Sequence, residues 1–251
     1  KRRLRKRRGW DIMQNEIVRQ LAPTGKLRAG INLLNFLLVT GKGAHGEPQG
    51  VAPDLARAIA DRLGVPLELV PFETPGELAD AAVSDAWDIG LIGAEPARAL
   101  HIDFTTAYVE IEATYLVPPG SPLLRVEDVD RAGNRIAVAA RSAYDLWLQR
   151  NIHHATLVHA EGFEATFDAF VTGGLEAMAS LRPGLFPYLE RLPGSRVLDG
   201  RFTAVQQSIG VRKGRAQAHA FLQQFVDEAK SSGLVAQLIA RHSVKGLTVA
   251  A

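Results

Sequence analysis

The chain has 251 residues, of which 47% are hydrophobic, and a mean hydropathy near zero, which is typical of a globular protein with one large or two small domains. It contains no cysteine, which excludes disulfides, thiolate metal sites and cysteine nucleophiles. The net charge of +2 arises from residues 1–8: without their seven basic side chains, 22 basic residues face 27 acidic ones, a net charge of −5.

The basic block Lys1–Arg8 is typical of a solvated arm. Such an arm could contact nucleic acid or an acidic membrane surface, but no aromatic residue interleaves with it and no binding motif follows, so we expect no nucleic-acid partner. No apolar segment follows it either, so these residues do not indicate a signal peptide. The apolar run Ile31–Val39 is too short to span a membrane.

The first half of the chain predicts alternating helices and strands, the order of a parallel sheet with right-handed crossovers. The glycine-rich segment Gly41–Gly50 matches neither phosphate-binding spacing, so we expect a mobile surface loop there. Asp54 lies where a carboxylate would cap the next helix. In order, the expected elements are a helix at 10–21, a strand at 26–34, a helix at 55–63 ended by Gly64, a strand at 65–70, a helix at 75–83 and a strand at 88–93.

The second half predicts another α/β unit after a long extended run. Ser142 is a plausible N-cap, and Asp145 three residues later is close to a capping box. Three phenylalanines, Phe163, Phe167 and Phe170, share one helix face and indicate core. In order, the expected elements are an extended run at 108–117, a strand at 135–140, a helix from 142, a strand at 156–158, a helix at 162–171, a strand pattern at 173–183, a return segment at 196–210 and helices at 216–231 and 234–242.

The stretch Ala86–Thr105 carries the strongest functional signal. Its apolar run ends at Gly93, as a buried parallel strand would, and ligands of open α/β sheets bind beyond the carboxyl ends of strands. Arg98 follows a few residues later, and its planar guanidinium suits a carboxylate. Alternatively, Arg98 forms a surface pair with Glu95 at helical spacing, which would contribute little stability. The residues alone leave both interpretations open.

This stretch resembles the type II solute-binding proteins of the polar amino-acid uptake class, which carry a T-I-T-P-E-R pattern followed by D-F-S or D-F-T. Gly93-Ala94-Glu95-Pro96-Ala97-Arg98 and Asp103-Phe104-Thr105 stand in register with these patterns, and weaker similarities in the same order extend over residues 26–245. The resemblance implies a two-lobed α/β fold, each lobe a mainly parallel sheet flanked by helices, joined by two extended hinge crossovers. The implied parts are a basic tail and N-terminal helix at 1–24, a discontinuous first lobe at 25–107 and 206–251, and a second lobe at 108–205.

The resemblance also implies a ligand site in which Arg98 clamps a carboxylate. Phe36 matches a ligand-covering aromatic, although a core phenylalanine at a strand end is the alternative. The hydroxyl and amides near Ser142 would hold the same carboxylate at a helix N-terminus, and one of Gln206 and Gln207 should face the cleft. The full set expected to contact the ligand is Asn32, Phe36, Gly93, Ala94, Glu95, Arg98, Arg141, Ser142, Ala143, Leu181 and Gln207.

Two departures from the family pattern bear on the ligand. Leu181 stands where the family has an aspartate that pairs with the ligand's α-ammonium, and a leucine cannot offset that buried charge. Arg141 and Ala143 replace a glycine and a hydroxyl. We therefore expect an anionic ligand different from, or larger than, an ordinary α-amino acid. Arg182 would meet another acidic group or remain a solvated loop arginine.

Three functions are compatible with these residues. The first, which we favour, is the substrate-binding component of an ABC-type uptake system: a monomer, periplasmic or extracytoplasmic, that captures a carboxylate-bearing solute by hinge closure and delivers it to a membrane permease. The second is a dehydratase of the cyclohexadienyl or arogenate type, with Glu95 or Glu176 as general acid. The third is the ligand-sensing domain of a receptor. We expect no cofactor and no metal, because His153 and His154 are adjacent and lack acidic partners at ligand spacing.

Overall fold

The computed structural model describes residues 15–251, which divide into two compact units. The described part of unit 1 comprises residues 15–109, 207–244 and 249–251, and unit 2 comprises residues 110–206 and 245–248. The basic block and the start of the helix expected at 10–21 lie outside the described residues. That helix is present over residues 15–21.

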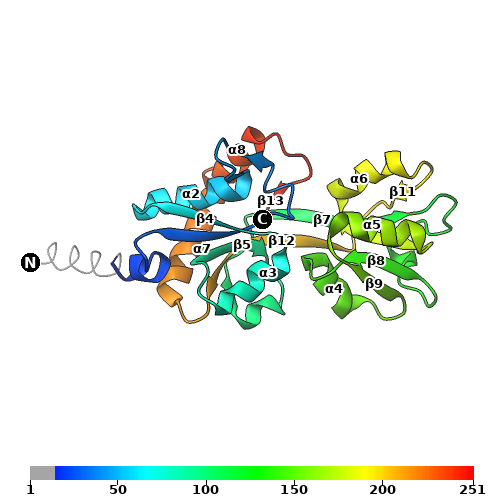
Figure 1. The fold of residues 1–251 in the computed structure, drawn as a ribbon, viewed down its shortest axis with the longest axis horizontal. Coiled ribbons are helices and arrows are strands. Elements are labelled where there is room, and N and C mark those ends of the chain that lie inside the picture. Colours follow the sequence, from blue (N-terminus) through cyan, green and yellow to red (C-terminus); the bar gives the residue numbers. More distant parts are fainter. Residues whose placement is uncertain (1–14) are drawn as a thin grey trace, which may run out of the picture. The chain divides into compact units, whose positions relative to one another are not determined.

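Unit 1 is built on a sheet whose central strands are parallel (Figure 1). β1 lies between β4 and β5 and is parallel to both, whereas β12 is antiparallel to β5 and to β6. The carboxyl ends of β1, β4 and β5 therefore share one edge of the sheet, where α/β proteins bind ligands. The strands are β1 (Leu27–Asn32), β4 (Leu67–Phe72), β5 (Ile89–Gly93), β6 (Ile102–Phe104) and the part of β12 (Thr203–Arg212) from residue 207 onward.

The helices of unit 1 begin and end at recognisable signals. α2 ends at Gly64, whose left-handed φ of 71° suits a residue without a side chain. α3 begins at Thr74, whose side chain accepts the N–H of Glu77 at 3.2 Å in a capping box. The helices are α2 (Val51–Leu63), α3 (Pro75–Asp80), α7 (Ala216–Ser231) and α8 (Leu234–Arg241), with 3-10 turns at Ala81–Val83 and Arg98–Leu100.

Two expectations for residues 41–54 need correction. The segment expected to be a mobile surface loop contains a short hairpin of β2 (Gly41–Lys42) and β3 (Pro48–Gln49), whose two-residue strands are too short to show a pattern in the sequence. Asp54 does not cap α2, whose N-cap is Gly50. Its carboxylate instead lies 2.9 Å from Nε2 of His242, so it joins α2 to the end of α8.

The core of unit 1 centres on Trp87, which is completely buried and donates its Nε1–H to the Leu78 carbonyl at 2.9 Å. The ring packs on two glycines that are paired across the sheet: a Cβ at Gly30 would lie 3.2 Å from the Trp87 ring, and one at Gly90 would lie 3.0 Å from Leu78. These glycines allow the tryptophan to approach the strands closely.

Unit 2 repeats the α/β plan, again with three parallel strands. β10 lies between β7, to which it is antiparallel, and β8, to which it is parallel; β8 is also parallel to β9. β11 pairs with β7. The elements are β7 (Val109–Val117), a 3-10 turn at Val126–Asp128, β8 (Arg135–Ala139), α4 (Ala143–Asn151), β9 (Thr156–Ala160), α5 (Gly162–Thr172), β10 (Ala177–Leu181), α6 (Arg182–Arg191) and β11 (Arg196–Val197). A short strand β13 (Thr248–Val249) precedes the C-terminus.

The core of unit 2 confirms part of the expected aromatic face of α5. Phe167 and Phe170 are buried, and Phe167 stacks on Tyr188 with ring centroids 4.3 Å apart. Tyr188 belongs to α6, a helix that the strand pattern at 173–183 did not predict. Among residues 15–251, no helix is both long and apolar enough to cross a membrane.

Candidate ligand-binding site

Arg98 begins the 3-10 turn that follows β5, beyond the carboxyl edge of the unit 1 sheet. Its side chain donates Nη1–H to the Gly93 carbonyl at 2.7 Å, and the residue is only 6% exposed. Glu95, which is 9% exposed, positions it: the Glu95 carbonyl accepts the N–H groups of Arg98 and Ala99, both at 3.0 Å. The alternative that Arg98 is a surface arginine is therefore wrong, because the residue is buried. A buried guanidinium held at a strand end suits anion binding.

Three other expected residues lie at the same edge of unit 1. Asn32 ends β1, and its Oδ1 accepts the N–H of Leu34 at 3.2 Å, which turns the chain away from the sheet. Phe36 is 39% exposed, so the alternative of a core phenylalanine is wrong. Gln207 on β12 lies opposite Gly93 in the strand register and is buried. Ala94 follows Gly93 directly, so the expected contact residues of unit 1 lie on segments that meet at this edge of its sheet.

The expected residues of unit 2 gather at the N-terminus of α4. Ser142 is the N-cap, as predicted, and its side chain accepts the N–H of Asp145 at 3.1 Å. The carboxylate of Asp145 accepts the N–H of Arg141, not of Ser142, at 2.7 Å. Arg141 has a left-handed φ of 59°, which is unusual for a residue with a side chain. Ala143 opens the helix, so the capped N-terminus of α4 and a cation lie together here.

Asp145 has a larger role than the sequence indicated. It is fully buried, and besides the Arg141 N–H its carboxylate contacts Nε2 of Gln149 and Nε2 of His159, both at 2.9 Å. The carboxylate therefore fixes the turn that carries Arg141. Sequence reasoning could identify the cap from spacing, but His159 lies on β9, and only the sheet register brings it to this point.

Leu181 ends β10 and is 5% exposed, so the position expected to meet a ligand amine is apolar. The next residue, Arg182, begins α6 and is not a solvated loop arginine. Its Nε donates to the Glu112 carboxylate at 2.9 Å, and its other nitrogens donate to the carbonyls of Leu198 and Gly200. Arg182 thus holds three segments of unit 2 together.

Glu176, which we considered as a general acid, lies just before β10 at the opposite edge of the unit 2 sheet. The guanidinium of Arg135 donates two hydrogen bonds to its carboxylate and lowers its pKa. A lowered pKa is the wrong direction for a group that must hold a proton at neutral pH. Within the described part of the chain, no three His, Asp or Glu side chains group closely enough to hold a metal ion.

A family model, that of the bacterial extracellular solute-binding proteins, family 3, matches residues 39–245. The chain belongs to this family. The match covers most of both units and includes the turn that carries Arg98, the N-terminus of α4 and the end of β10. It confirms the family resemblance inferred from the sequence. No curated protein matches the chain.

Several solved structures have a similar fold. An ancestral amino acid-binding protein, AncCDT-1, a precursor of cyclohexadienyl dehydratase, is 22% identical with a TM-score of 0.73 over 91% of this chain and 99% of its own. The P235GK mutant of ArgBP from T. maritima is 21% identical, with a TM-score of 0.72 over 91% of this chain and 100% of its own. AbpA from Streptococcus pneumoniae, an amino acid ABC transporter substrate-binding protein bound to L-arginine, is 20% identical, with a TM-score of 0.71 over 90% of this chain and 98% of its own. These likenesses confirm the expected fold class.

Proposed function

We propose that this solute-binding protein captures a small carboxylate-bearing solute, amino-acid-like or a derivative, for an ABC-type uptake system. The ligand would be held between the Arg98 edge of unit 1 and the α4 N-terminus of unit 2, with closure of the units around it by bending at the crossovers. A membrane permease of the transporter would then receive it. The family match and the amino acid-binding proteins of similar fold support this role.

The observation that carries the proposal is the burial of Arg98. A guanidinium remains charged at any physiological pH, and burying it is unfavourable unless carbonyls or anions surround it. The Gly93 carbonyl accepts one of its five N–H donors. A carboxylate can accept two such donors side by side, which gives both affinity and orientation.

The test is ligand binding by an Arg98→Ala variant. We would titrate the protein with carboxylates, free amino acids and opines by calorimetry, and repeat the best ligand on the variant. Affinity should fall at least about 30-fold, the effect of removing one partner of a buried charge pair. Arg98→Lys should recover part of it, and Arg57→Ala, which removes an exposed arginine of the same unit, serves as the control. Unchanged affinity in a folded Arg98→Ala variant would remove Arg98 from the site.

A dehydratase remains the second candidate because one protein of similar fold is a precursor of such an enzyme. Glu176 is unsuited to proton donation, which leaves the buried Glu95 as the general acid that this function would need. Incubation with prephenate or arogenate, monitored by the absorbance of the aromatic product, separates the two functions. Product that disappears in Glu95→Gln would favour the enzyme.

A further inference from the structure

Gln207 is a buried polar side chain without an evident structural task. The residue is 4% exposed, and its Oε1 has no hydrogen-bond partner in the part of the chain that the structure describes. The neighbouring Gln206 differs, since its amide nitrogen donates to the Ala204 carbonyl at 3.1 Å. A buried acceptor left unpaired is costly, so such a group calls for a functional explanation.

The position of Gln207 connects it to the candidate anion site. In the ladder between β12 and β5 it is the partner of Gly93, whose carbonyl accepts the hydrogen bond from Arg98. Partner residues of an antiparallel pair present their side chains on the same face. Because Gly93 has no side chain, no side chain lies directly opposite the Gln207 carboxamide on β5. The unpaired Oε1 of Gln207 therefore belongs to the strand beside Gly93, whose carbonyl holds Arg98.

The groups bonded to Gln207 add no charge. Its carbonyl accepts the N–H of Tyr108 at 2.9 Å. Tyr108 is completely buried, its hydroxyl also lacks a partner among the described residues, and burial raises its pKa, so it stays neutral. A neutral carboxamide can accept a hydrogen bond from an ammonium, but it cannot offset the charge that burial leaves on that ammonium.

The charges of the proposed contact residues favour a particular ligand charge. Arg98 and Arg141 are cations and Glu95 is an anion, while the other contacts proposed above are neutral. Leu181, at the position expected to meet a ligand amine, is apolar and buried. A ligand with one carboxylate and no ammonium therefore leaves no positive charge to be neutralised at that position.

We propose that Gln207 determines specificity by accepting a hydrogen bond from an uncharged O–H or N–H of a monoanionic carboxylate. The ligand class is then 2-hydroxy acids and N-acyl amino acids, in preference to the free amino acid with the same side chain. This inference rests on the proposed function, because it assumes that Arg98 holds the carboxylate of the same ligand.

The test compares three forms of each probe: L-alanine, L-leucine and L-glutamine, their N-acetyl derivatives and the corresponding 2-hydroxy acids. In calorimetric titrations of the whole chain, a hydroxy or acetyl form should bind at least about tenfold tighter than its amino acid. Gln207→Leu should abolish that preference, and Gln207→Glu should reverse it, because a carboxylate can pair with the ammonium. Gln206→Leu, the matched control, should keep it. If Gln207→Leu unfolds, Gln207→Met keeps the side-chain length.

The possible failures are distinguishable. If carboxylates bind and depend on Arg98, but amino acids bind tightest or Gln207→Leu leaves the preference unchanged, this inference is overturned and the proposed function stands. If no probe in any form binds, both are overturned. A Gln207→Glu variant that gains affinity for free amino acids supports the inference most directly, since a purely structural role would not produce a gain.

Discussion

The two units contain the same ion-pair arrangement at the amino ends of their parallel strands, but they bury it differently. In unit 1, Arg28 of β1 binds Asp88, which precedes β5; in unit 2, Arg135 of β8 binds Glu176, which precedes β10. Each carboxylate accepts the backbone N–H, Nε and Nη2 of its arginine, at 2.8–3.1 Å in unit 1 and 2.7–3.0 Å in unit 2. The side chain of Asp88 is completely buried, whereas that of Glu176 is 32% exposed.

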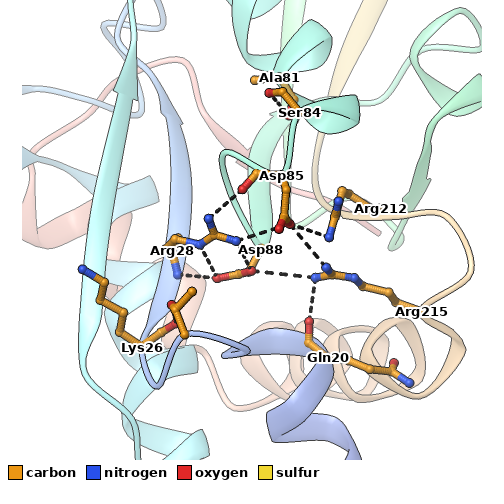
Figure 2. Close-up of polar contacts among 10 residues, drawn as sticks. Gln20, Lys26, Arg28, Ala81, Ser84, Asp85, Asp88, Arg212 and Arg215 are labelled. Carbon is orange, nitrogen blue, oxygen red and sulfur yellow. Dashed lines mark hydrogen bonds and ion pairs between the residues drawn. The ribbon is translucent and has the colours of Figure 1, made fainter.

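The surroundings differ as well. In unit 1, Asp85, Arg212 and Arg215 extend the pair into a network (Figure 2). Nη2 of Arg212 lies 2.5 Å from the Asp85 carboxylate, and Nη1 of Arg215 lies 3.8 Å from Asp88. Burial, with Arg212 nearby, lowers the pKa of Arg215. The guanidinium groups of Arg28, Arg212 and Arg215 thus face only two carboxylates, those of Asp85 and Asp88. Asp88 therefore offsets part of the charge of Arg215 as well as that of Arg28. The same local geometry therefore aligns strands in both units, but only unit 1 depends on it to bury charge.

The largest predicted effect follows from this difference. Asp88→Asn keeps the size of the side chain and removes its charge, so that Arg28 and Arg215 lose a buried counter-charge. We expect the free energy of unfolding to fall by about 3 kcal/mol, at the lower end of the range for a broken buried ion pair because both arginines retain some solvent contact. Denaturant unfolding followed by circular dichroism measures it.

Glu176→Gln is the matched variant in unit 2 and should lose clearly less stability, because solvent already screens that pair. Equal losses in the two variants would show that burial does not distinguish the pairs. A larger loss in Glu176→Gln would reverse the comparison between the units.

A second prediction concerns pH. Arg135 holds the folded-state pKa of Glu176 below its ordinary value of 4.5. The pair therefore stabilises the fold above that ordinary value, and its contribution is lost as the pH falls through the lower, folded-state pKa. The stability difference between the wild type and Glu176→Gln should be present at pH 7 and should shrink below pH 4.5. A difference that is the same at pH 7 and in acid would show that Glu176 acts through packing and not through charge.

Most of the strands and helices could be located along the chain from the sequence, because local signals mark where each one begins or ends. Apolar runs such as Ile89–Gly93 appear where the structure has strands, and Gly64 ends α2 as expected. α6 could not be predicted, because Pro187 lies in its interior, where proline disfavours a helix. Burial of Leu185 and Tyr188 against the sheet overrides that preference.

The candidate site shows a similar limit. Arg98 and Ser142 could be found from short motifs, since a strand end or a cap is visible within a few residues. The contact of Asp145 with His159 and the pairing of Gln207 with Gly93 depend on strand register, which joins residues far apart in the chain. The pairing of Glu176 with Arg135 could not be predicted for the same reason, because the arginine lies 41 residues earlier in the chain.

The smallest predicted effect compares two residues with left-handed backbone, Asp85 in unit 1 and Arg141 in unit 2, both at a φ of 59°. Relief of this conformation by glycine is worth about 1–2 kcal/mol, and the greater freedom of glycine in the unfolded chain offsets about 0.5–1 kcal/mol. Arg141→Gly should therefore change the free energy of unfolding by no more than about 1.5 kcal/mol while weakening binding of an anionic ligand. Asp85→Gly gains the same relief but removes a carboxylate that three arginines contact, so it should lower stability. If Arg141→Gly were the more damaging variant, Arg141 would be a residue that supports the fold of unit 2, and its place in the anion site would have to be abandoned.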